Sequence, residues 1–186
     1  MEITRALLLR RTKLTESSLI LSWLSASHGR IQTVAKGARS PKSPFSGRVD
    51  LFFDCEIRFA PARKSDLHRL CEVSLCNPHE GVRKTLPNLR TATYFVQLLE
   101  ATTEPDSPAP DLHNLLQRAL GHLSSHVASQ RALLHFEKQL ALLLGILQHD
   151  VPAWECLAPF LTTPLRERAS LLPSLPQDPT PLPHSS

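Results

Sequence analysis

The sequence is short of aromatic residues and of cysteines. Aromatic side chains make up 5% of its 186 residues, so any platform for stacking nucleic-acid bases has to be small. The four cysteines, Cys55, Cys71, Cys76 and Cys156, do not form the framework of a secreted disulfide scaffold and are expected to be reduced thiols. No apolar run has the length of a membrane span, and the N-terminus alternates like a strand instead of forming a signal-peptide core. A cytoplasmic protein is expected.

Motifs for catalysis and metal binding are missing as well. The sequence has no GxSxG nucleophile elbow, no GxxxxGK[ST] phosphate loop and no HExxH zinc helix. Cys71, Cys76 and His79 have part of the spacing of a zinc cluster, but positions five apart on an extended strand point to opposite faces. We therefore expect no enzyme, no cofactor and no metal site.

What the sequence does have is an uneven distribution of charge. Residues 1–90 contain 16 Lys and Arg against 8 Asp and Glu, a net charge of +8, whereas the remaining residues have 5 against 9, a net charge of −4. A basic first half is typical of a module that binds a polyanion.

The basic residues are densest in the stretch AKGARSPKSPF, residues 35–45. Lys36, Arg39 and Lys42 follow one another at intervals of three, among glycine, serine and proline. Glycine and proline occur too often here for a helix or a central strand, so a loop is predicted. Cations with small hydroxyls and backbone amides suit phosphate groups, although a solvated loop without a partner has the same composition.

An alternation of period two marks five strand-like segments, residues 3–11, 18–24, 31–35, 48–60 and 67–74. In the fourth segment, Leu51 and Phe53 are expected to face the core and Phe52 the opposite side. Five short strands with a long connection after the third predict an α+β protein whose residues 1–79 form a five-stranded OB-type β-barrel. Such barrels bind single strands of nucleic acid across one face.

A helical period of 3.6 replaces the alternation after residue 80. Apolar stripes predict helices over residues 82–99, 112–123 and 130–149 and a short helix within 151–172. Residues 80–172 are therefore expected to form an α-helical domain. Five prolines between residues 173 and 186 predict a disordered tail.

Nucleic-acid binding is the best supported function at this point. Phe45 and Trp23 are candidate stacking rings, and Trp23 is favoured as a core residue. Arg63, Lys64 and Arg69 form a second cluster, which fits a solvated surface as well as a bound one. The candidate DNA-binding cations are Arg10, Arg11, Lys13, Arg30, Lys36, Arg39, Lys42 and Arg48.

The segments ExSxI at residues 16–20, HGR at residues 28–30 and AKGARSPKSPF resemble the RecO family of bacterial recombination mediators. The resemblance covers residues 1–150 and implies a DNA-repair protein without enzymatic activity. It implies binding to single- and double-stranded DNA, annealing of complementary strands and work at the bacterial nucleoid. By position, the basic barrel residues of the family correspond to Arg30, Lys36, Arg39 and Lys42.

The resemblance also implies two protein partners, RecR and the acidic, Phe-ending C-terminal tail of single-stranded-DNA-binding protein. Through these, the family helps a recombinase to load onto coated strands. Such a tail needs an apolar groove with a cation for its carboxylate, and Arg131, Leu134 and Lys138 are the candidates. Many family members have a cysteine-rich zinc module after the third helix, but this sequence has only Cys156 there, so zinc is not expected.

Three other functions remain open on the sequence alone. A general RNA- or nucleic-acid-binding OB module would prefer RNA to DNA of the same sequence. A protein-only adaptor would use the basic loop for an acidic partner and would bind no DNA at low salt. A metal-dependent hydrolase would lose activity with a chelator.

Overall fold

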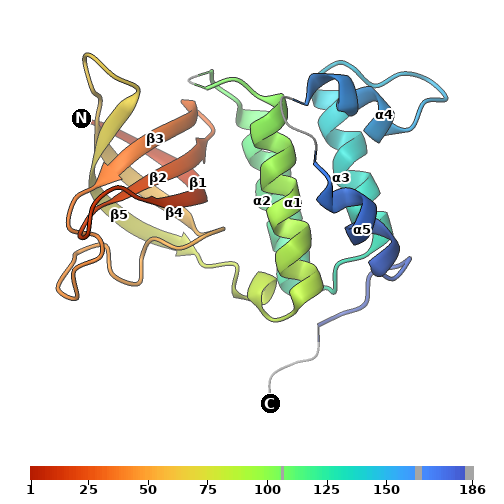
Figure 1. Cartoon of the computed structure of the whole chain (residues 1–186), viewed down its shortest axis with the longest axis horizontal. Helices are drawn as coiled ribbons and strands as arrows, with labels where there is room; N and C mark the ends of the chain where they lie inside the picture. Colours follow the sequence, from red (N-terminus) through yellow and green to blue (C-terminus); the bar gives the residue numbers. More distant parts are fainter. Residues whose placement is uncertain (106, 162–164, 183–186) are drawn as a thin grey trace. The chain divides into compact units, whose positions relative to one another are not determined.

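The computed structural model describes residues 1–105, 107–161 and 165–182, and it divides into two compact units (Figure 1). The first unit contains Met1–Pro78 together with Glu104–His113, and the second contains the remaining residues. Pro105 bridges to Arg30, so the segment between the first two long helices belongs in part to the barrel unit.

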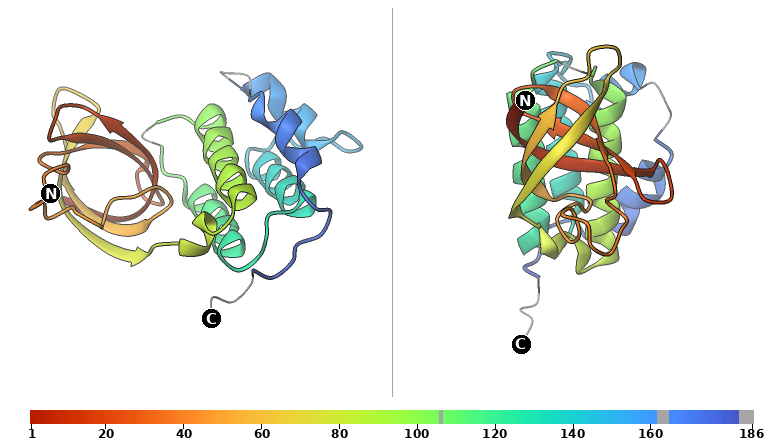
Figure 2. Two further views of the ribbon diagram at one scale, coloured as in Figure 1. Left: turned by 60° about the horizontal axis from the view of Figure 1, so that its bottom comes forward. Right: turned by 90° about the vertical axis from the view of Figure 1, so that its left-hand side faces the viewer.

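The first unit is a closed five-stranded barrel of the OB type (Figure 2). Around the barrel the order is β1-β2-β3-β5-β4, and β3 pairs with β5 in parallel while the other neighbours are antiparallel. The predicted fold class is confirmed. The strands are β1 (Glu2–Lys13), β2 (Leu19–Ser25), β3 (Gly29–Ala35), β4 (Asp54–Ala60) and β5 (Leu67–Asn77).

Alternating apolar residues fill the inside of the barrel. Trp23 and Phe59 are among its largest fully buried side chains. The indole Nε1 of Trp23 donates to the hydroxyl of Thr33 at 2.9 Å, so the one polar atom of this ring is satisfied inside the core. The placement of Trp23 in the core is confirmed. Gly29 closes the turn before β3 with a φ of 67°, and a Cβ there would lie 1.9 Å from the carbonyl oxygen of Ser107.

The prediction of a fourth strand over residues 48–60 is wrong for its first half, residues 48–53. The chain turns at residues 50–53, where the amide of Phe53 donates to the carbonyl of Asp50, and β4 begins only at Asp54. Phe52 takes a φ of 67° in this turn and is 2% exposed, whereas Phe53 and Leu51 are half-buried. The turn reverses the expected alternation because it inserts a left-handed residue into a pattern that assumes extended backbone.

Three longer helices build most of the second unit, namely α1 (Leu86–Thr102), α2 (Pro110–Ser125) and α3 (Gln130–Leu143), and the first turn of α2 is counted with the first unit. Thr85 caps α1 and Ser129 caps α3, each by accepting a hydrogen bond from the backbone amide three residues later. The predicted third helix is too long: it ends at Leu143 because Gly145 adopts a φ of 70°. Leu143, its last residue, is 41% exposed.

A buried asparagine joins the first two helices. The Nδ2 atom of Asn88 donates to the carbonyls of Leu123 and His126 at 2.6 and 2.8 Å, and its Oδ1 accepts from the amide of Ala128 at 2.7 Å. These contacts satisfy backbone groups at the end of α2 that have no partner within the helix. The short helix η1 (Glu80–Arg83) precedes α1.

A buried ion pair fixes the last helix to this unit. Glu137 of α3 is 1% exposed and accepts from Arg168 at 2.6 and 2.9 Å and from the hydroxyl of Tyr94. The guanidinium of Arg168 also lies 4.7 Å from the ring centre of Trp154. These residues bring together α1, α3, α4 (Ala153–Leu157) and α5 (Glu167–Ser174), and η2 (Ala158–Phe160) follows α4.

The prediction of a disordered tail is wrong for residues 173–182. Pro173 lies inside α5, and the chain beyond it runs along the connection between α2 and α3. The carbonyls of Pro176 and Gln177 accept from the first two amides of α3, and Leu182 is 7% exposed. Proline lacks an amide but keeps its carbonyl, so a proline-rich segment can serve amides that α3 leaves unpaired. Residues 183–186 lie outside the described residues.

Candidate nucleic-acid interface

Seven of the eight predicted DNA-binding cations gather at one end of the barrel. They come from the end of β1 and from the loop between β3 and β4, and they are called the basic end below. The loop is bound to the turn after β1, since the amide of Arg39 donates to the carbonyl of Ser17 at 3.0 Å. The basic end consists of Arg10, Arg11, Lys13, Lys36, Arg39, Lys42 and Arg48, all exposed.

The loop of the basic end is ordered by its own backbone and by the core. Backbone hydrogen bonds close successive turns from Gly37 to Ser40, from Ser40 to Ser43 and from Ser43 to Ser46. Phe45 inserts into the barrel core and is 5% exposed, so it anchors the loop. Its candidacy as a stacking ring is wrong, because a base has no access to a ring inside the core.

Three cations of the basic end face carboxylates. Arg11 Nη1 lies 2.6 Å from Asp50 Oδ1, and Lys13 Nζ lies 2.5 Å from Glu16 Oε1. Arg39 Nη1 donates to the carbonyl of Glu16 at 3.1 Å and lies 3.9 Å from its Oε2 atom. Each of these side chains has a nearby negative charge, which reduces its attraction for a phosphate group.

Three other cations of the basic end have no such neighbour. Lys36, Lys42 and Arg48 are exposed and make no ion pair or side-chain hydrogen bond with any residue in ranges 1–105, 107–161 and 165–182. Only mobile counterions balance their charges. These cations can therefore contact the phosphates of a nucleic-acid strand without first breaking an ion pair. These three side chains are therefore the strongest candidates for contacts to phosphate groups.

The eighth predicted cation, Arg30, lies elsewhere. It belongs to the first residues of β3, and the basic loop begins after the last residue of that strand. The seven residues of β3 place Arg30 toward the opposite end of the barrel, beside Pro105. The family-based assignment therefore combines positions that the barrel separates.

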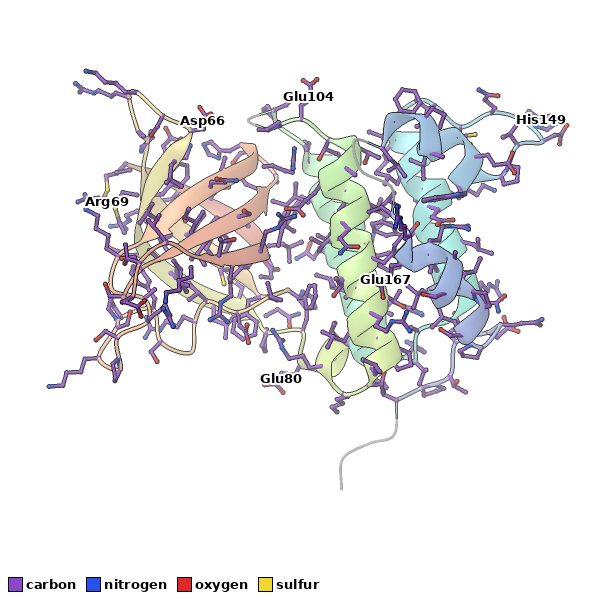
Figure 3. All side chains as sticks on the ribbon, in the orientation of Figure 1. Asp66, Arg69, Glu80, Glu104, His149 and Glu167 are labelled. Atoms are coloured by element: carbon purple, nitrogen blue, oxygen red, sulfur yellow. The ribbon has the colours of Figure 1, made fainter. Side chains whose placement is uncertain are left out.

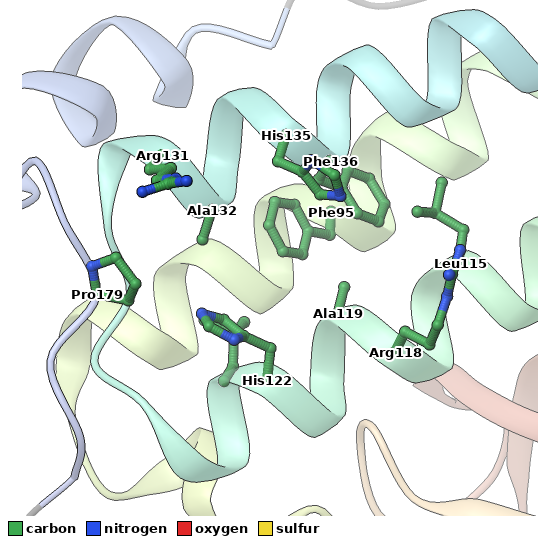
Figure 4. Close-up of a pocket in the computed structure, with 11 residues that line it drawn as sticks. Phe95, Leu115, Arg118, Ala119, His122, Arg131, Ala132, His135, Phe136 and Pro179 are labelled. Carbon is green, nitrogen blue, oxygen red and sulfur yellow. The ribbon is translucent and has the colours of Figure 1, made fainter.

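A second candidate site is a pocket of about 330 Å³ within the helical unit (Figure 4). Its floor contains the stacked rings of Phe95 and Phe136, whose centroids are 3.9 Å apart. Arg118 from α2 and Arg131 from α3 stand at its edges, and Pro179 closes one side (Figure 4). None of the described residues that line it is acidic, although Asp178 Oδ1 lies 3.5 Å from Arg131 Nη1, so the pocket combines an apolar floor with cations at its edge.

Two histidines, His122 and His135, add titratable groups to this pocket. The ring of His122 stacks on that of His126 with centroids 4.5 Å apart and planes within 8°. Burial lowers the pKa of His122, and the neighbouring His126 and His135 lower it further. A bound anion would oppose this effect because it stabilises the protonated imidazole.

The three residues proposed for a peptide tail fall in two places. Arg131 lines the pocket just described, whereas Leu134 and Lys138 line a different hollow beside Trp154 and Arg168. That hollow also contains the carboxylates of Glu137 and Asp150, so it suits an anionic peptide less well. No sequence pattern marks Arg118, His122 and His135 as site residues, because polar residues beside an apolar helical stripe are typical of ordinary helix surface.

Within 1–105, 107–161 and 165–182, no three histidine, cysteine or acidic side chains are grouped as metal ligands would be. None of the helices in the same ranges is long and apolar enough to cross a membrane.

Comparisons with known proteins identify relatives for both units. Residues 1–79 match the family model "Recombination protein O N terminal", and residues 83–147 match "Recombination protein O C terminal". The DNA repair protein RecO of Aliivibrio fischeri is 30% identical over 181 residues, which are 95% of this chain and 74% of the relative.

Two further relatives bear the same name. The DNA repair protein RecO of Rhodopirellula baltica is 32% identical over 140 residues, which are 75% of this chain and 52% of the relative. The Idiomarina loihiensis protein is 33% identical over 144 residues, which are 76% of this chain and 59% of the relative. The match therefore spans about half of the Rhodopirellula protein.

Proposed function

The chain belongs to the RecO family of DNA repair proteins, and from this premise we propose that it is a recombination mediator without enzymatic activity. In this role it binds single- and double-stranded DNA, anneals complementary strands and helps a recombinase to load onto strands coated by single-stranded-DNA-binding protein. It acts with RecR, and this partner is proposed from family membership alone.

The basic end supports the DNA-binding part of the proposal. The observation that best supports DNA binding is that Lys36, Lys42 and Arg48 project from an ordered loop and have no carboxylate partner in the described part of the chain. Each phosphate that such a cation neutralises releases condensed counterions, which favours binding at low salt. With Phe45 and Trp23 in the core, stacking on these two rings adds nothing, and the contacts expected are to the backbone rather than to the bases.

Annealing follows from the same neutralisation of phosphate charge. Two complementary strands repel each other because both carry dense negative charge, and this repulsion slows the encounter of their bases. A protein that neutralises phosphates and leaves base edges exposed lowers that barrier without any covalent step. This is consistent with the absence of recognised catalytic motifs in the sequence.

The pocket in the helical unit supports the recruitment part. A peptide tail that ends in an aromatic residue could place its ring against Ala119, Ala132 and Pro179, which are half-buried, and its carboxylates near Arg118 and Arg131. The volume of about 330 Å³ accommodates one large side chain with its backbone. Arg131 is therefore retained as a tail contact, with Arg118 added, while Leu134 and Lys138 lie in the other hollow.

Two measurements on the whole chain test the two parts. Fluorescence anisotropy of a labelled single strand, and of the same sequence as duplex and as RNA, is measured against salt; tight binding of DNA that weakens with salt is expected. Annealing of complementary strands coated with single-stranded-DNA-binding protein is then compared for partner with and without its acidic tail. Arg118→Ala is expected to behave like removal of the tail.

The outcomes separate the alternatives. Absence of DNA binding at low salt with retained peptide binding would favour a protein-only adaptor. A clear preference for RNA over DNA of identical sequence would favour a general RNA-binding module. Annealing that is equally fast with and without the tail would refute the role of the pocket while leaving strand binding intact.

A further inference from the structure

The hairpin between β4 and β5 carries a second group of cations at the barrel surface. Arg63, Lys64 and Arg69 are exposed, and none of them makes an ion pair or side-chain hydrogen bond with a residue that the structure describes. Asp66 is the acidic residue of the hairpin loop itself, so the hairpin retains a net positive charge. Figure 3 labels Asp66 and Arg69 on this hairpin, which extends beyond the barrel wall. Arg63 and Lys64, in the loop itself, are called the hairpin surface; Arg69 lies further along β5 and pairs with Val34, two residues before Lys36 of the basic end.

The base of the hairpin is firmly held. The ring of His68 stacks on Phe59 with centroids 5.3 Å apart, and Phe59 is 1% exposed in the barrel core. His68 Nδ1 also accepts a hydrogen bond from the amide of Ala62 at 3.2 Å, which ties the loop to the following strand. The cations are thus presented from a braced turn, which lowers the conformational entropy lost when a ligand binds.

The hairpin surface and the basic end lie at opposite ends of one strand. The basic loop leads into β4 and the hairpin follows it, so the seven residues of β4 separate the two groups. At about 3.3 Å per residue this separation is roughly 20 Å. Arg30 lies at the hairpin's end of the barrel, because Gln32, two residues further along β3, pairs with the first residue of β5.

We propose that the hairpin surface binds a second nucleic-acid strand while the basic end holds the first. This rests on the proposed function, since it assigns the second strand of the annealing reaction to a site of its own. A separation of roughly 20 Å exceeds the Debye length of about 8 Å at physiological ionic strength, so two bound strands repel each other weakly. Holding both on one protein raises their effective concentration toward each other.

The test uses two short DNA strands of non-complementary sequence, one with a donor dye and one with an acceptor. Because they cannot pair, energy transfer between them reports strands held together by the protein. The test variant is Arg63→Ala/Lys64→Ala, and the matched control is Lys138→Ala/Arg166→Ala, which removes the same charge from exposed positions of the helical unit. Anisotropy with one strand in excess protein reports the first binding event separately.

The wild type and the control are expected to give energy transfer, and the hairpin variant to lose it while still binding one strand. With about 0.7 counterions released per phosphate, loss of two contacts weakens second-strand affinity roughly 25-fold at about 0.1 M salt. Unchanged energy transfer in the hairpin variant, or no energy transfer in the wild type despite strand binding, would overturn the proposal. A wild type that binds no strand at low salt would overturn the proposed function, and this proposal with it.

Discussion

The pairing of cations at the basic end allows a quantitative prediction about salt dependence. Two triple variants remove the same charge: Lys36→Ala/Lys42→Ala/Arg48→Ala removes unpaired cations, and Arg11→Ala/Lys13→Ala/Arg39→Ala removes cations that face Glu16 or Asp50. For a single strand, each phosphate contact contributes about −0.7 to the slope of log affinity against log salt concentration. The unpaired triple variant should therefore lose about 2 units of slope and roughly 100-fold in affinity at about 0.1 M salt.

The paired triple variant should lose less than half as much slope. A cation beside a carboxylate neutralises less phosphate charge, so it releases fewer of the counterions condensed on the strand. The reverse change supports the same reasoning: Glu16→Gln leaves Lys13 and Arg39 unopposed and should steepen the slope by up to about 1.4 units. Glu16 has an 88% exposed side chain, so this substitution should leave stability unchanged.

The assay is anisotropy of a labelled single strand titrated at a series of salt concentrations, with circular dichroism to verify folding of each variant. Equal loss of slope in the two triple variants would show that the ion pairs do not shape the interface in solution. An unchanged slope in the unpaired variant would show that the strand follows another face of the barrel. Either result would refute the assignment of Lys36, Lys42 and Arg48 as the main phosphate contacts.

Three further predictions concern stability, each measured by urea unfolding. The pKa of His122 is lowered by burial and by two neighbouring histidines, so the unfolded chain binds its proton at higher pH; the free energy of unfolding should fall as pH decreases below about 6.5, and less so in His122→Gln. A pH profile that is identical in both proteins would contradict this. Glu137→Ala leaves two buried partners unpaired and should cost about 3–5 kcal/mol, whereas Arg90→Ala breaks a partly exposed pair and should cost about 1 kcal/mol or less. Equal losses would refute the importance of burial. Gly37→Ala forces an alanine to adopt a positive φ and should cost about 1–2 kcal/mol. Gly29→Ala has the same strain and also places its Cβ against backbone atoms of Ser107, so it should cost clearly more. Similar losses of stability for the two variants would argue against this tight contact.

Much of the barrel could be predicted because its strands follow the alternation of period two. The exception at Phe52 has a local cause, since one left-handed residue changes which side chains face inward and no sequence pattern marks a non-glycine residue with a φ of 67°. The prediction of disorder from the proline content of residues 173–182 was wrong for a different reason. A proline-rich segment has few amide donors, but its carbonyls can still accept hydrogen bonds, and here those of Pro176 and Gln177 accept from the first two amides of α3.

The candidate site was predictable as a set of residue types but not as an arrangement. The spacing of Lys36, Arg39 and Lys42 indicates a basic loop, yet only the fold shows that Arg39 faces Glu16 and that Arg30 lies toward the other end of β3. Phe45 was ambiguous for a similar reason, because a ring in a basic loop can stack on a base or anchor the loop. Such choices depend on contacts between residues distant in sequence, which one sequence does not contain.

The path of residues 176–182 affects when the helical pocket becomes complete. Pro179 forms one wall of that pocket, but it follows α3 by a long interval in the chain. A nascent polypeptide on the ribosome makes the barrel and the first three helices before this wall, and domains generally fold as they emerge. The growing chain therefore acquires its basic loop early, and the helical pocket is complete only after Pro179 has been added.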